Sequence, residues 1–126
     1  MKGINTENKK PKYSEMLMQL VEQFDEQLPE TLSFEDTLEV GIEAWNLANN
    51  KSNLGEDLYK KELKAHKYND VIEKMVVNKL EHFAEYNNII VDFSTENDIL
   101  QVKSQTLEDH FNSLLSRMIN VKPTKK

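Results

Sequence analysis

The chain contains no cysteine among its 126 residues. This absence excludes a disulfide framework, a thiolate nucleophile and a cysteine-ligated zinc site. No apolar run approaches the roughly 20 residues needed to cross a bilayer, so we expect no contact with a membrane. The first residues also lack the apolar segment of a secretory signal. Together these absences favour a soluble, cytoplasmic protein.

Glycine and proline are scarce, at three residues each. Isolated glycines cannot build a phosphate-binding loop, which excludes nucleotide chemistry through a P-loop or a dinucleotide fingerprint. Few breaks in the chain also predict long helices or strands. We expect one domain at residues 13–120, between flexible basic tails at residues 1–12 and 121–126.

Arginine occurs once, and the formal net charge is −6. Each tail contributes +3, which leaves −12 on the body between the tails. Residues 13–50 contain nine acidic side chains and no lysine or arginine. A body of this charge repels phosphate backbones, so we expect no direct binding of nucleic acid.

Apolar residues recur at helical spacing in four segments, residues 14–28, 34–50, 54–66 and 70–86. Pro29 is expected to end the first helix, and Ser33 to cap the second. The second segment carries apolar residues on two faces, which predicts a central helix packed from both sides. Gly41 inside it predicts a close approach of another helix, since glycine lowers helix propensity.

The period changes from helical to alternating in residues 88–94 and 99–104. These two short segments, rich in β-branched residues and separated by four residues, predict an antiparallel hairpin. The alternation predicts a register in which Phe93 faces Leu100.

A last helix is expected to follow Thr106, with Thr106 and Asp109 as a capping box, and to run to about residue 120. Its apolar residues predict a buried stripe of Leu107, Phe111, Leu114, Leu115 and Met118. The predicted fold class is therefore mainly α, a small single-domain bundle of about five helices. One two-stranded antiparallel hairpin precedes the last helix, in the order ααααββα.

The three histidines are the candidates for chemistry, although no histidine-rich metal motif accompanies them. Glu62 and His66 are four residues apart and would share a helix face, as a pair of metal ligands does. His110 falls on the apolar stripe of the last helix, where it is either a base near carboxylates or a hydrogen-bonded core residue. Since nothing in the spacing brings these residues together, we predict no catalytic residue, no metal site and no cofactor.

The pattern of charge favours a small acidic, non-enzymatic protein-interaction module of regulatory, inhibitor or immunity type. An acidic surface attracts basic protein partners and speeds their association. The expected contact surface consists of Glu22, Glu26, Glu39 and Glu43. Frequent asparagine and lysine with little arginine suggest a bacterial origin.

Two alternatives remain open at this point. One is a metal-binding or hydrolytic helical-bundle enzyme that uses Glu62, His66, His82 or His110. The other is a homo-oligomeric assembly module, such as a homodimer in which the hairpin edge pairs with a second copy.

Overall fold

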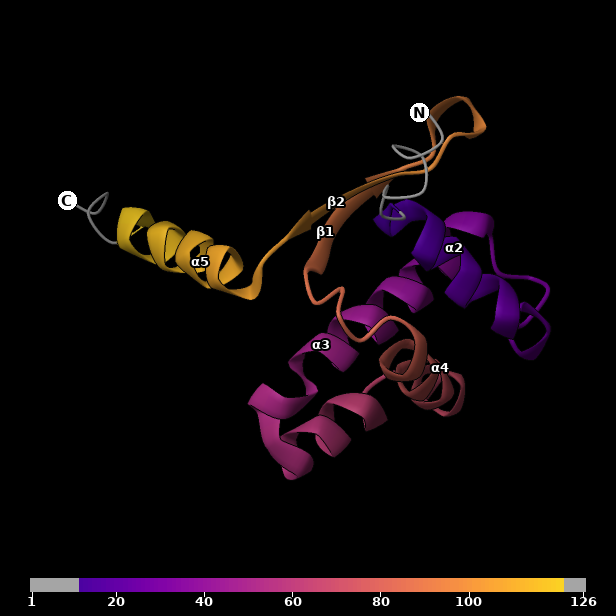
Figure 1. The fold of residues 1–126 in the computed structure, drawn as a ribbon, viewed down its shortest axis with the longest axis horizontal. Helices are drawn as coiled ribbons and strands as arrows, with labels where there is room; N and C mark the ends of the chain where they lie inside the picture. The colour runs from indigo at the N-terminus through magenta and orange to yellow at the C-terminus, as the bar shows by residue number, and fades with distance from the viewer. Residues whose placement is uncertain (1–11, 122–126) are drawn as a thin grey trace, which may run out of the picture.

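The structure is a computed structural model that describes residues 12–121. Within this range the chain forms four α-helices and one hairpin (Figure 1). The helices are α2 (Tyr13–Phe24), α3 (Phe34–Lys64), α4 (Asn69–His82) and α5 (Leu107–Val121). The strands are β1 (Ile89–Ser94) and β2 (Gln101–Gln105). The mainly α fold with a hairpin before the last helix is confirmed, whereas the predicted number of about five helices is one too high. Apart from Lys12 and Val121, the two expected tails lie outside the described residues.

The difference in helix number arises in α3, which joins the helices expected at residues 34–50 and 54–66. The expected loop between them is helical, and the break comes later, at Gly55. Gly55 has φ 81° and ψ 164°, a conformation that glycine reaches without steric cost because it has no β-carbon. The chain changes direction at this residue, so the last part of α3 folds back toward the first (Figure 1).

Both predicted caps are present. The Ser33 side chain accepts a hydrogen bond of 3.0 Å from the Asp36 backbone N–H at the start of α3. The Thr106 side chain accepts one of 3.0 Å from the Asp109 backbone N–H at the start of α5. The first helix ends at Phe24, and a short 3₁₀ turn leads from it toward Pro29.

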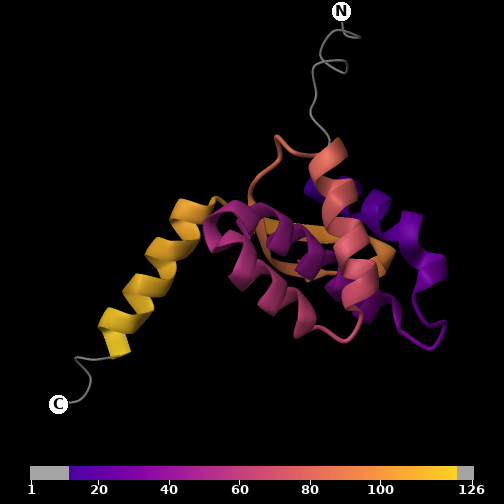
Figure 2. The same cartoon turned by 90° about the horizontal axis from the view of Figure 1, so that it is seen from below.

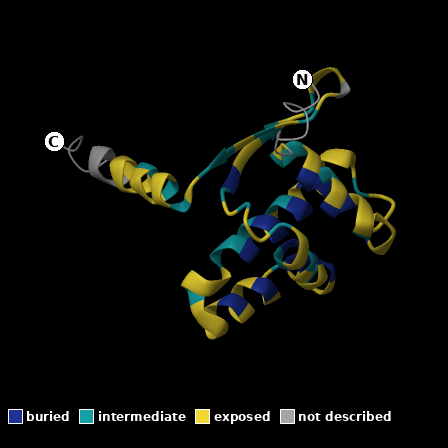
Figure 3. Ribbon diagram, in the orientation of Figure 1, coloured by how far each residue is buried: buried dark blue, intermediate teal, exposed yellow. Residues whose placement is uncertain are grey.

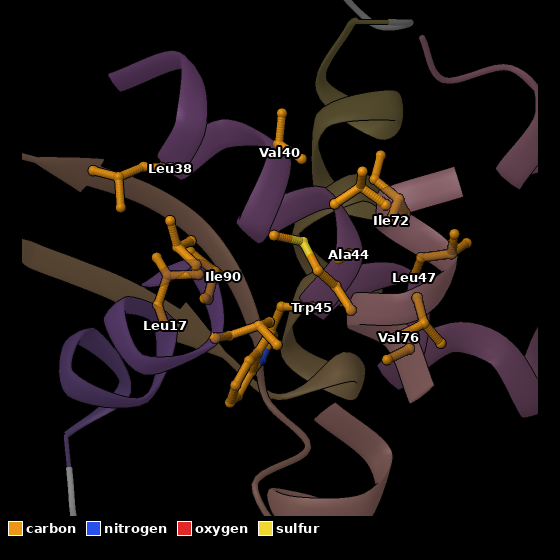
Figure 4. Packing of buried hydrophobic residues seen from close by; sticks show 14 of the residues in the cluster. Leu17, Leu38, Val40, Ala44, Trp45, Leu47, Ile72, Val76 and Ile90 are labelled. Atoms are coloured by element: carbon orange, nitrogen blue, oxygen red, sulfur yellow. The ribbon is translucent and has the colours of Figure 1, made fainter. Parts of the chain in front are cut away.

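α3 lies between the hairpin and α4, with α2 beside it (Figures 1 and 2). Figure 4 shows the centre of the core, where Trp45 and Ala44 of α3 have Leu17 and Ile90 on one side and Val76 on the other. The prediction of a central helix packed from both sides is therefore confirmed. Two apolar residues of α3, Phe34 and Leu58, are exposed.

Gly41 marks the closest approach of α2 and α3. A β-carbon at this position would lie 2.5 Å from Cγ2 of Val21 and 3.2 Å from Cδ1 of Leu17. Both of these α2 side chains are buried in the core. The close helix approach predicted from this glycine is therefore present.

The hairpin is antiparallel as predicted, but its register differs. Phe93 faces Val102 rather than Leu100, because the turn is two residues longer than expected and includes Asn97 at φ 56°. A bulge at Val91 then interrupts the alternation. The consecutive residues Ile89 and Ile90, which precede the bulge, are both buried, and Ile90 packs in the core.

α5 projects from the helical body (Figures 1 and 2). The stripe predicted to be buried is largely exposed: Phe111, Leu114 and Leu115 are 50%, 37% and 54% exposed. Figure 3 shows no buried residue along the described part of α5. Only Thr106 separates β2 from α5, so the helix continues away from the body along the path of the strand.

Replacing Gly41 with alanine tests the close approach. Alanine gains about 0.8–1 kcal/mol of helix propensity, but the overlap with Val21 costs more, so we expect a net loss of about 1–2 kcal/mol. Chemical denaturation monitored by circular dichroism measures this change. The matched control is the same substitution in a Val21→Ala background, where the added methyl group has room and most of the loss should disappear. A G41A protein as stable as the original would contradict the packing.

Candidate functional site

A polar part of the interior lies where α3 meets the segment that leads into β1. Trp45 and Asn49 are one helical turn apart on α3 and face this segment. Trp45 Nε1 and Asn49 Nδ2 each donate a hydrogen bond of 2.9 Å to the carbonyl oxygen of Asn88. The backbone N–H of Asn88 in turn donates to the hydroxyl of Tyr13, at 3.2 Å. Asn88, the residue before β1, is therefore held by side chains of both α2 and α3.

Asn46 holds the strand itself. Its side-chain Nδ2 donates to the carbonyl oxygen of Ile90 at 2.8 Å, and its Oδ1 accepts from the N–H of Ile90 at 2.7 Å. An amide that pairs with both backbone groups of one residue replaces the neighbouring strand at that point. The bulge at Val91 follows directly after this contact.

Lys79 of α4 is the remaining member of this polar cluster. The side chain is 0% exposed, and its Nζ donates to Asn49 Oδ1 and, at 3.0 Å, to the carbonyl oxygen of Tyr86. The same Nζ lies 4.7 Å from the centre of the Trp45 ring, within the range of a cation–π contact. Burial lowers the pKa of Lys79 from 10.5 to about 8, because desolvation disfavours the ammonium form.

A lysine with a lowered pKa is often a catalytic group, but this one is enclosed. The ammonium group has three N–H donors, and two oxygens and one aromatic ring lie against it. The protein's own groups therefore satisfy all three donors. We assign Lys79 to positioning the segment around Tyr86. The sequence did not suggest this residue, although Lys79 continues the apolar stripe of Met75 and Val76 at helical spacing, and that position was the available signal.

His66 contacts a carboxylate other than the one expected. Its Nδ1 lies 2.9 Å from Oε1 of Glu43, a residue of the first part of α3. Glu62 does not make this contact, but it lines the same small cleft of about 250 Å³ as Glu43 and His66. The reversal of direction at Gly55 brings these residues together. Among residues 12–121, no group of three or more histidine, aspartate or glutamate side chains is placed to hold a metal ion.

The other two histidines do not line that cleft. His110 is partly buried and lines a cleft of about 600 Å³ between α5, the hairpin and α3, together with Arg117, Asp92 and Lys103. These ionisable neighbours have mixed charge. His82 is exposed at the end of α4.

The four acidic residues of the expected contact surface fall into two separate pairs. Glu39 and Glu43 lie about 160–200° around α3 from Gly41, the residue that touches α2. Glu22 lies about 120° around α2 from the side chains that touch Gly41, and Glu26 follows on the adjoining 3₁₀ turn. All four are exposed. The structure brings Glu39 and Glu43 together and places them on the opposite side from Glu22.

Comparisons with protein-family models, with curated proteins and with solved structures find no match to this chain. Over the described residues, no helix combines the length and apolar character required to cross a membrane.

Replacing Asn46 with aspartate tests the clamp on β1. Aspartate has the same shape and still accepts from the Ile90 N–H, but its carboxylate cannot donate to the Ile90 carbonyl. We expect a loss of about 2–3 kcal/mol in unfolding free energy, measured by chemical denaturation. Asn50→Asp is the matched control, because Asn46 and Asn50 line the same cleft and both substitutions add one negative charge. Equal stability of the two variants would contradict the clamp.

The lowered pKa of Lys79 predicts a rise of stability with pH. Between pH 8 and 10.5 the unfolded chain binds a proton at this residue that the folded protein has lost. Below pH 8 the buried charge therefore lowers the unfolding free energy by its full amount. By pH 9.5 about 2 kcal/mol of this loss is regained. We expect unfolding free energies measured from pH 7.5 to 9.5 to rise more steeply in the original protein than in Lys79→Met. Parallel curves would show that Lys79 keeps an ordinary pKa.

Proposed function

We propose that the protein is a small, acidic, non-enzymatic protein-interaction module and that α5 is its contact element. The observation that carries this proposal is the apolar face of α5, where Phe111, Leu114 and Leu115 are all exposed. We call this face, together with Leu107, the α5 stripe. Groups of exposed apolar residues on one face are typical of surfaces that bind another protein.

The length of α5 supports the same conclusion. An isolated helix of about 15 residues is only marginally stable in water, because helix nucleation is costly and most helical stability comes from packing. The body covers the α5 stripe only in part, so a binding partner would supply the missing packing. An amphipathic helix that lays its apolar side on another protein is a common mode of recognition.

The acidic body suggests a second contact, with a basic protein, apart from the α5 stripe. The negative charge of residues 13–50 attracts a basic partner from a distance and raises the rate of association. Since the two acidic pairs lie on different sides of the α2–α3 pair, one flat partner surface would contact only one of them. Glu39 and Glu43 are the stronger candidates, because both line a shallow groove of about 300 Å³ with His66 and Lys67.

A photo-cross-linking amino acid at position 115, in the protein expressed in cells, tests the role of α5. We expect cross-links to another polypeptide chain from this position. Val77 of α4 serves as the matched control, because it is an apolar helix residue of similar exposure outside the α5 stripe. Equal cross-linking from positions 115 and 77, or none from 115, would contradict the assignment of α5.

Charge reversal tests the acidic pairs separately. We expect Glu39→Lys with Glu43→Lys to weaken binding of a basic protein that co-purifies with the chain several-fold at low salt, and to flatten the salt dependence. Glu22→Lys with Glu26→Lys introduces the same change in charge elsewhere and should leave affinity nearly unchanged. Isothermal titration calorimetry at two salt concentrations measures both. Unchanged binding in both double variants would assign the acidic residues to solubility.

A metal-binding or hydrolytic enzyme is the second candidate, supported by the contact between His66 and Glu43 in the cleft that Glu62 also lines. A stoichiometric metal ion in protein purified without chelators would favour it. Loss of that ion in His66→Ala, but not in His82→Ala, would place the ion in this cleft.

A further inference from the structure

We propose that the partner of α5 is the α5 helix of a second copy of this chain, packed antiparallel about a two-fold axis near Leu114. This inference rests on the proposed role of α5 as the contact element and names the chain that it contacts. Three observations support it: the spacing of the stripe, the distribution of charge along the helix and the exposed area.

The spacing of the apolar residues is that of a helix–helix seam. In the sequence, one series of apolar residues is spaced alternately by four and three residues: Leu107, Phe111, Leu114, Met118 and Val121. Leu115 of the α5 stripe lies next to this series. This heptad spacing of 3.5 residues is typical of a helix that packs along another helix. Leu114 is also the middle residue of α5. An antiparallel pair centred on it therefore overlaps along its whole length, as a symmetric contact between identical helices requires.

The charges select the antiparallel orientation. The first turn of α5 contains Glu108 and Asp109, and Arg117 lies nearer its other end. Lys122, Lys125 and Lys126 follow in the sequence. An antiparallel pair brings the acidic first turn of each helix toward Arg117 of the other, and it aligns the helix dipoles favourably. A parallel pair would bring like charges together at both ends.

The exposed area fits a weak, reversible dimer. Three large apolar side chains with about half of their surface exposed offer on the order of 300 Å² on each copy. Two copies would thus cover roughly 600 Å² of apolar surface, whereas a stable interface buries about 1,200–2,000 Å² in total. Val91 of β1 is also exposed and lines the same cleft as Leu114, so the hairpin can extend the contact. We therefore expect dimerisation at micromolar concentrations rather than a permanent dimer.

The hairpin edges fit a second copy less well. The amide of Asn46 already pairs with both backbone groups of Ile90, which covers β1 at that residue. β2 carries the exposed Lys103, and lysine on an edge strand discourages pairing with another strand. Val102 packs against the core, so a proline placed there would disturb the core together with the edge. Dimerisation through α5 is therefore favoured over strand pairing.

Sedimentation velocity of the full chain from 1 to 100 μM tests the proposal. We expect the original protein to change from the 14.7 kDa monomer toward a mass of about twice that value as concentration rises. Leu114→Glu places two like charges at the two-fold axis and should keep the protein monomeric throughout. Ser116→Glu is the matched control, since it adds the same charge to the same helix about 160° from Leu114. It should dimerise like the original. Circular dichroism checks that both variants keep the fold.

The other outcomes separate this inference from the proposed function. A monomer at every concentration, with cross-links from position 115 to a different protein, would overturn the second copy and leave α5 as the contact element. A monomer with intramolecular cross-links from position 115 to the cleft residues would show that α5 closes on its own body, and would overturn both. A dimer that persists in Leu114→Glu, or that is lost equally in Ser116→Glu, would overturn the α5 seam.

Discussion

The hydrogen bonds that α3 sends to the backbone of residues 86–90 hold the hairpin on the helical body. Trp45, Asn46 and Asn49 make these bonds from adjacent positions of one helix, and the two-stranded hairpin has no further strand within the described residues. Two strands alone are marginal in water, so the hairpin depends on this attachment. The direction of β2, and with it the direction of α5, follows from how residues 88–90 are held.

Lys79 shows what this attachment costs. A buried ammonium group loses its hydration, and the lowered pKa is the direct sign of that loss. In return its Nζ bonds the side chain of Asn49 and the carbonyl of Tyr86, so that the segment before β1 is held from α4 as well as from α3. The cluster therefore lowers the stability of the folded protein at neutral pH but fixes the path of the chain before β1. Since α5 follows that path, the buried cluster and the exposed helix belong to the same architecture.

The features that sequence predicted correctly depend on local chemistry or on one helix. Ser33 and Thr106 cap helices through their own side chains, and Gly41 marks a close approach because no larger residue fits. The predicted register of the hairpin was wrong because the turn is two residues longer than expected. The bulge shifts the register again, next to the contact of Ile90 with Asn46, which is 44 residues away in the chain. The cleft that holds His66 and Glu43 was missed for a related reason, since the chain reverses only at Gly55.

The amphipathic pattern of α5 correctly indicated a helix with an apolar side, but not which chain would cover that side. The central claim is that a second copy covers it. Hydrogen exchange measured by mass spectrometry at 1 and 100 μM tests this most directly, because amide protection reports packing helix by helix. We expect α5 to exchange rapidly in dilute protein and to become protected at high concentration, while α2, α3 and α4 exchange equally slowly in both. Protection of α5 that does not change with concentration would contradict it.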